Sequence, residues 1–167
     1  MIGILGAMQA EVQALIGNLG NKKSEQIGSL IFYTGRLQGK EVVIAACGIG
    51  KVFAAMCAQT MAVKYSPDCI INTGGGGTLT SALSIGDGAV SDNVVQHDMD
   101  TSPIGDPKGL LSGINVINIS ADEKLIALAE SIIKEQNINC KKGIIASGDQ
   151  LIARKVQKDF IISEFSA

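Results

Sequence analysis

The chain has 167 residues, of which 46% are hydrophobic and 18% are charged, and its formal net charge is −2 at pH 7. This composition indicates a globular protein, excludes an intrinsically disordered chain, and is most simply explained by a single domain over residues 1–167. Nucleic-acid binding requires a concentrated basic face, which a weakly acidic chain with isolated basic pairs such as Lys22-Lys23 does not provide, so we expect no nucleic-acid partner.

The cysteines and the single histidine argue against a metal centre. Cys47, Cys57, Cys69 and Cys140 show no paired CxxC spacing, and His97 is the only histidine. A metal site would need these residue types in a cluster, so we expect no metal, reduced thiols and a cytoplasmic location. No basic and then apolar signal opens the chain, and no uncharged apolar run reaches transmembrane length, so we expect no membrane partner.

Strand and helix patterns alternate along the first half of the chain. Residues 1–5 predict a short apolar strand, and a helix is predicted from residue 9 to residue 19 after the corner Gly6-Ala7-Met8. Residues 17–23 are expected to end this helix in a turn. The runs "SLIFYTGRL" and "EVVIAACG" predict two strands joined by a hairpin turn at residues 38–40.

A helix is predicted next over residues 51–65. Apolar residues nearly encircle it, which indicates burial either inside the fold or in a subunit interface. The run "DCIINTGGGG" then predicts a fully apolar strand that enters a glycine run.

The second half continues the alternation. "GDGAVSDNVVQHD" predicts a strand, and "TSPIGDPKGLLSG" a polar loop. Ser120 to Glu123 has the S-x-x-E form of a capping box and predicts a helix to about Gln136. "KKGIIASGD" predicts a further strand. Apolar strands that alternate with helices imply an α/β fold, in which helices cover both faces of a mainly parallel sheet.

Three predicted strands end in small residues, in "ILGAMQAE", "IINTGGGG" and "IIASGDQLI". The carboxyl ends of strands form the edge at which open α/β sheets bind ligands, and small residues let a ligand approach the backbone. These endings favour one shared pocket. Glu11 follows the first of them, in the first turn of a helix. From position alone, its simpler explanation is that it complements the helix dipole.

Two patterns exclude common nucleotide sites. In "GIGKVF", Phe53 stands where the dinucleotide fingerprint needs its third glycine, so we expect no nicotinamide cofactor. "GGGGTLTS" lacks the Gly-Lys of a phosphate-binding loop. His97 lies in "QHDMD", where a structural role is more common than a catalytic one. The nearby Asp98, Asp100 and Asp106 lack the ligand order of a calcium loop, so a solvated acidic loop is expected.

Six stretches together resemble the 5'-methylthioadenosine/S-adenosylhomocysteine nucleosidases of the nucleoside phosphorylase superfamily. They are "IGILGAMQAEV", "CGIGKVFAA", "DCIINTGGGG", "SIGDGAVSD", "QHDMDTSPIGDP" and "GIIASGDQLI", and they span residues 2–152 in the family's order. The resemblance implies a three-layer fold with a mixed, mainly parallel central sheet and flanking helices. It also implies that water, without a cofactor, hydrolyses the N-glycosidic bond of an adenine thionucleoside and releases adenine, a step of methionine salvage.

The resemblance assigns roles to individual residues. Glu11 matches the glutamate that activates the attacking water. The positions that match the substrate-binding residues are Ala7, Met8, Ile49, Gly75, Gly76, Gly77, Leu151 and Ile152. Among them, Ile49 corresponds to a contact with the 5'-alkylthio group, and Leu151 and Ile152 correspond to the pair that brackets adenine.

The chain departs from the family pattern in two places. The family usually has serine and alanine where Gly75 and Gly76 stand, and glycine where Thr78 stands. After Ala167 the family continues with a ribose-binding glutamate, an aspartate that protonates the leaving adenine, a strand and a terminal helix. We therefore expect a C-terminally incomplete domain, and little or no activity from residues 1–167 alone.

Other functions remain open at this point. Futalosine hydrolase and nucleoside phosphorylase activities belong to the same superfamily. Phosphorylases need arginines to hold phosphate, and Arg36 and Arg154 both lie outside the "GAMQAE" and "INTGGGG" stretches, so water is the expected nucleophile. A catalytically silent nucleoside-binding fragment is the alternative from another class. The apolar helix at residues 51–65 and the resemblance together predict a homodimer.

Overall fold

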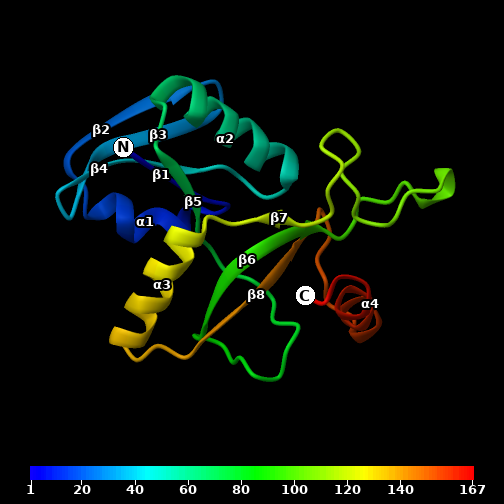
Figure 1. Ribbon diagram of the computed structural model, residues 1–167. Helices are drawn as coiled ribbons and strands as arrows, with labels where there is room; N and C mark the ends of the chain where they lie inside the picture. Colours follow the sequence, from blue (N-terminus) through cyan, green and yellow to red (C-terminus); the bar gives the residue numbers. More distant parts are fainter. The chain divides into compact units, whose positions relative to one another are not determined.

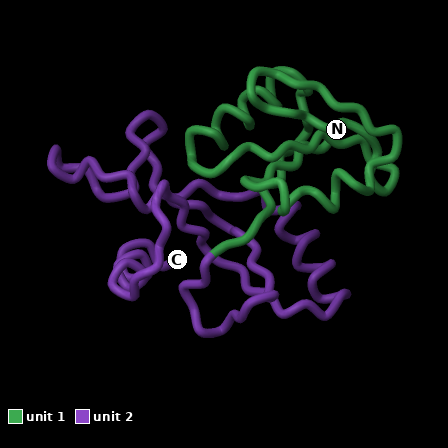
Figure 2. The backbone as a smooth tube through the Cα atoms, turned by 180° about the vertical axis from the view of Figure 1, so that it is seen from behind, with its two compact units in different colours: residues 1–76 green, residues 77–167 purple.

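The computed structural model describes residues 1–167, which form two compact units, Met1–Gly76 and Gly77–Ala167 (Figure 2). Each unit has a β-sheet of its own (Figure 1). That these two units together form a single domain over residues 1–167 stays a prediction.

The first unit is built on a five-stranded mixed sheet. Its elements are β1 (Ile2–Gly6), α1 (Gln9–Gly17), β2 (Gly20–Ile27), β3 (Leu30–Leu37), β4 (Lys40–Ala46), α2 (Lys51–Tyr65) and β5 (Cys69–Asn72). The strand order is β2-β3-β4-β1-β5. β1 lies in the middle and pairs in parallel with β4 and β5, whereas β2, β3 and β4 form an antiparallel meander. The strands predicted in this half are present, and α2 has the predicted bounds.

The middle strands of this sheet, β1 and β4, are buried on both faces, since their alternate residues point to opposite sides and pack into two hydrophobic clusters. The cluster on the α1 side comprises Ile4, Val12, Ile16, Leu19, Val42 and Ile44. The cluster on the α2 side comprises Leu5, Leu30, Phe32, Val43, Ala45, Cys47, Cys57 and Met61. Burial on both sides explains why β1 and β4 are apolar without alternation. Helix, sheet and helix therefore form three layers in this unit.

Close packing of α2 on β1 depends on Gly3. A Cβ atom at this position would lie 2.6 Å from the sulfur of Met61. The opposite side of α2 carries exposed apolar side chains: Val52, Phe53, Met56 and Val63. The sequence predicted burial of this helix on most of its sides. Within one chain, however, only Cys57 and Met61 of α2 are buried.

β2 replaces the turn that the sequence predicted at residues 17–23. Its sequence, "GNKKSEQI", is polar because β2 is an edge strand whose side chains are exposed along most of its length. The ladder to β3 holds it in place, and the register shifts between Gly20 and Lys23, where Asn21 has a positive φ of 54°. A polar edge strand with a bulge carries no apolar periodicity, so the sequence pattern could not show it.

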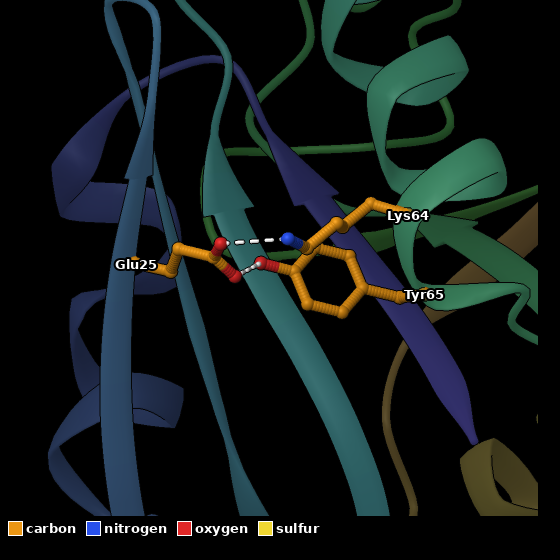
Figure 3. A network of polar contacts seen from close by, with 3 residues as sticks. All are labelled: Glu25, Lys64 and Tyr65. Carbon is orange, nitrogen blue, oxygen red and sulfur yellow. Dashed lines mark hydrogen bonds and ion pairs between the residues drawn. The ribbon is translucent and has the colours of Figure 1, made fainter.

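A polar network ties β2 to the last turn of α2. The carboxylate of Glu25 accepts hydrogen bonds from Lys64 Nζ at 2.7 Å and from the Tyr65 hydroxyl at 3.0 Å (Figure 3). These bonds lower the pKa of Glu25. Burial, aided by the hydrogen bond to Glu25, raises the pKa of Tyr65 to about 12. The Tyr65 ring also packs against Phe32, with ring centroids 5.4 Å apart.

The second unit contains a three-stranded sheet. Its elements are β6 (Gly88–Gln96), the 3₁₀ turn η1 (Ser102–Ile104), β7 (Ile119–Ser120), α3 (Glu123–Glu135), β8 (Cys140–Ser147) and α4 (Lys155–Phe165). β6 is central, antiparallel to β7 and parallel to β8. Val95 of β6 is buried against Ile161 and Phe165 of α4.

Two features of this unit correct the sequence analysis. Helix α4 was not predicted, because its two buried residues are too few to give a clear apolar stripe. Helix α3 begins after Asp122, whose carboxylate accepts hydrogen bonds from the backbone N–H groups of Lys124 and Leu125 at 2.9 and 3.0 Å. Ser120, the predicted cap, lies in β7 instead, where its hydroxyl donates to Asn93.

The four cysteines carry free thiols. None of the helices is both long and apolar enough to cross a lipid bilayer.

Candidate active site

Three loops meet at the carboxyl edge of the first sheet. Because β1 is parallel to β4 and β5, all three strands end at this edge. Backbone hydrogen bonds extend the pairing into the loops: Cys47 N–H donates to Gly6 O at 2.9 Å, Gly48 N–H to Ala7 O at 2.9 Å, and Thr73 N–H to Leu5 O at 2.8 Å. This is the edge at which α/β sheets bind ligands.

Glu11 joins two of these loops through its carboxylate. Oε2 accepts a hydrogen bond from the backbone N–H of Met8 at 2.8 Å, and Oε1 accepts one from the backbone N–H of Gly75 at 2.9 Å. Met8 is the residue that caps α1, so the carboxylate also satisfies a free N–H at the helix start. The structural role suggested by the position of Glu11 is therefore present, together with a contact to the glycine run 64 residues away.

These hydrogen bonds set the charge of the site. Donation from Met8 N–H, and after it from Gly75 N–H, lowers the pKa of Glu11, whereas partial burial opposes the shift. The carboxylate is therefore ionised at neutral pH. A carboxylate has about four lone-pair sites, so two bonds to N–H groups leave room for a water molecule. An ionised, half-buried carboxylate at a ligand-binding edge is suited to accept a proton from that water.

Gly74 allows the glycine run to approach Glu11. A Cβ atom at residue 74 would lie 2.6 Å from Oε1 of Glu11 and 2.9 Å from its carboxyl carbon. A Cβ at Gly75 would come only within 3.9 Å of Oε1, and one at Gly76 would meet nothing within 4 Å. The family resemblance predicted Gly75, Gly76 and Gly77 as binding positions and did not include Gly74. The available signal was that this glycine is the first of the run to follow a strand parallel to β1.

Apolar side chains lie at the same edge as the carboxylate. Met8 is 47% exposed and Ile49 is 75% exposed. Cys47 is buried nearby, and its pKa is raised by burial and by the negative charge of Glu11. The first unit thus brings Ala7, Met8, Glu11, Ile49 and Gly75 to one edge.

The remaining predicted residues belong to the second unit. Gly77 opens it, and Leu151 and Ile152 lie in the loop between β8 and α4. Leu151 is 91% exposed, whereas Ile152 packs against the cluster around Val95. Their association with Glu11 in one pocket stays a prediction.

Other features of the surface are weaker candidates for a chemical site than this edge. An open depression of about 830 Å³ lies between the β2–β3 hairpin and α2, lined by Glu25, Gln26, Ile27, Gly28, Gln59, Thr60, Val63 and Lys64. Its charged lining groups, Glu25 and Lys64, are paired with each other. The structure holds no group of three or more His, Cys, Asp or Glu side chains arranged to bind a metal ion.

Comparison with known proteins identifies the family. All of residues 1–167 match the model of the phosphorylase superfamily. The chain belongs to this superfamily. A mutant of the Helicobacter pylori nucleosidase MTAN, solved with 5'-methylthioadenosine in its active site, is 36% identical with a TM-score of 0.95, and the match covers 99% of this chain and 72% of that one.

Two further structures are similar to the same degree. S-adenosylhomocysteine nucleosidase of Streptococcus pyogenes, in complex with 5-methylthiotubericidin, is 34% identical with a TM-score of 0.94, over 99% of this chain and 70% of that one. Native futalosine hydrolase of H. pylori is 36% identical with a TM-score of 0.95, over 99% and 71%. The predicted α/β fold class, the resemblance and the enzyme class are confirmed, because the chain is homologous to nucleosidases, which hydrolyse N-glycosidic bonds.

Proposed function

We propose that the chain is a nucleosidase domain that hydrolyses the N-glycosidic bond of 5'-methylthioadenosine and S-adenosylhomocysteine and releases adenine. The observation that carries the proposal is the ionised carboxylate of Glu11, held by the N–H groups of Met8 and Gly75 at the carboxyl edge of the sheet. The nucleosidases similar to this chain support the substrate class.

Glu11 would act on a water molecule beside the sugar. Glycosidic bonds break through a transition state with positive charge on the anomeric carbon, which a nearby carboxylate stabilises. As the bond from this carbon to the adenine nitrogen breaks, its electron pair leaves with the base, which takes a proton from solvent to become adenine. The water oxygen forms the new bond to carbon, and Glu11 takes the proton. A base in this role contributes typically 10²–10⁴-fold to the rate.

The side chains around Glu11 support a thioether substrate. Met8 and Ile49 offer exposed apolar surface at the edge, which suits an alkylthio group better than a free 5'-hydroxyl. We assign the backbone of Gly75, Gly76 and Gly77 to the nucleoside, and Leu151 and Ile152 to the adenine.

Water is a better candidate for the nucleophile than phosphate. Arg36 is opposite Glu41 in the ladder between β3 and β4, at the start of β4, whereas Glu11 lies at the edge where β4 ends. The Arg36 guanidinium is 3.8 Å from the Glu41 carboxylate. The first unit therefore places no arginine beside Glu11 to hold a phosphate.

The decisive experiment measures base release by chromatography, with and without phosphate, for wild type and Glu11→Gln. The proteins are the 167-residue chain and the same chain extended by the C-terminal segment of the H. pylori nucleosidase. Adenine release that is independent of phosphate and abolished by Glu11→Gln supports the proposal. Binding without turnover in both forms would favour a silent nucleoside-binding protein.

Futalosine is the substrate to test as a second candidate. A structure described as futalosine hydrolase matches this chain as well as the nucleosidases do. Faster base release from futalosine than from 5'-methylthioadenosine would select this alternative.

We further propose that the protein is a cytoplasmic homodimer that acts in methionine salvage. Free thiols at all four cysteines fit a reducing compartment. The exposed apolar side chains of α2, Val52, Phe53, Met56 and Val63, fit coverage by a second copy.

A further inference from the structure

The corners that follow β6 and β8 lie against each other. The two strands are parallel, and their last paired residues are Gln96 and Ser147. The pairing continues one step further, because the N–H of His97 donates to the carbonyl of Ser147 at 3.0 Å. Residues 97–98 are therefore neighbours of residues 148–149.

The side chain of Asp98 in the first corner holds the backbone of the second. Oδ2 of Asp98 accepts a hydrogen bond from the backbone N–H of Asp149 at 2.8 Å. A Cβ atom at Gly148 would overlap Nε2 of His97 and lie 3.0 Å from Cγ of Asp98. Glycine at residue 148 is therefore required because the imidazole and the carboxylate occupy the space that a side chain would need. Asp98 is half-buried, which corrects the expectation that it belongs to a solvated acidic loop.

The held backbone begins the loop that carries Leu151 and Ile152. No helix or strand covers residues 148–154, between β8 and α4. The loop is fixed at its start by Asp98, and further along by Ile152, which packs on the cluster around Val95. Leu151 lies between the two fixed points and is 91% exposed. Its direction is thus set by anchors on both sides.

We propose that Asp98 is a positioning residue for base recognition: it orders the loop that presents Leu151 and Ile152. This inference rests on the proposed function, in which these two residues bracket adenine. A loop that is ordered before binding loses less conformational freedom when the ligand arrives, and apparent affinity falls in proportion to the fraction of molecules with the loop in place. Asp98 contributes through Asp149 and touches no substrate.

The test combines hydrogen–deuterium exchange of residues 148–154 with calorimetric titration of 5'-methylthioadenosine. Asp98→Ala removes the acceptor, whereas Asp98→Asn keeps an oxygen of similar position. We expect Asp98→Ala to speed exchange at the Asp149 amide about tenfold, because the local opening loses one hydrogen bond to a charged group. Its affinity should fall by about threefold to tenfold. Asp98→Asn should recover most of both properties.

Asp100→Ala is the matched control, since it removes the same charge two residues away. Oδ1 of Asp100 accepts from Ser102 N–H at 2.9 Å, within its own loop. It should leave exchange of residues 148–154 unchanged. Unchanged exchange in Asp98→Ala, or faster exchange with unaltered affinity, would overturn the proposal. A wild-type chain that binds no nucleoside would overturn the proposed function and the ligand part of this inference, while the exchange comparison still decides whether Asp98 holds the loop.

Discussion

Gly74→Ala is expected to displace the carboxylate of Glu11. The added methyl group would lie 2.6 Å from Oε1, about 0.8 Å inside the 3.4 Å at which ordinary van der Waals contact begins. Either the carboxylate or the glycine run must move by this amount. The hydrogen bond from Gly75 N–H to Oε1 would lengthen from 2.9 Å and break.

The size of the effect follows from the tolerance of the reaction to misplacement. A shift of about 1 Å in a reacting group reduces rates by roughly 10²-fold. We expect kcat for adenine release to fall by about 10-fold to 100-fold, with KM changed by less than about threefold, because the displaced group acts on water rather than on the nucleoside.

The pH profile gives a second readout of the same displacement. The base works only when ionised, and the bonds from Met8 and Gly75 hold its pKa below the usual glutamate value. Wild-type activity should thus persist on acidification until the pH reaches this lowered pKa. In Gly74→Ala, loss of the Gly75 bond raises the pKa toward the usual value, so the acid limb should move to higher pH.

Gly17→Ala is the control for adding a methyl group to a glycine of this unit. A Cβ there meets nothing within 4 Å, so kinetics and pH profile should stay as in wild type. Retention of wild-type kcat and acid limb by Gly74→Ala would refute the steric argument.

Three further outcomes are expected. Glu11→Gln should lower adenine release by at least about 10²-fold and leave nucleoside binding measurable by calorimetry. In spectrophotometric titration, Tyr65 should ionise near pH 12, and normal ionisation near pH 10 would contradict the packing against Phe32. Light scattering at micromolar concentration should give a dimer mass that Phe53→Ser shifts toward monomer.

The sequence predicted those elements whose buried side chains form a recognisable apolar pattern along the chain. β4 is buried on both faces and reads as an apolar run, and α2 lies between a glycine corner and a polar turn, so both were found. β2 is polar because its side chains are exposed at the sheet edge, and α4 buries only Ile161 and Phe165, so neither gives a periodic signal. The capping-box pattern also predicted the wrong cap for α3. Ser120 pairs with Asn93 in the ladder between β6 and β7, and Asp122 caps the helix instead.

The candidate site was harder to predict from the sequence than the fold. Resemblance to known nucleosidases selected Glu11, and no spacing rule could predict that Gly75 donates to its carboxylate from 64 residues away. This contact depends on the order β4-β1-β5, which brings the end of β5 beside the start of α1. Gly74 could not be predicted for the same reason: glycine is required there by the side chain of Glu11, which is distant in sequence and close in space.

The two explanations of Glu11, helix cap and catalytic base, describe one arrangement. The N–H of Met8 that the carboxylate satisfies is also the largest cause of its lowered pKa. A lowered pKa makes Glu11 a weaker proton acceptor in the resting site, but it guarantees the negative charge. That charge is most valuable where positive charge grows on the anomeric carbon, and the proton of water becomes acidic only as its oxygen bonds to that carbon. Glu11 is therefore expected to stabilise charge first and accept the proton late, an order in which a weakly basic carboxylate suffices.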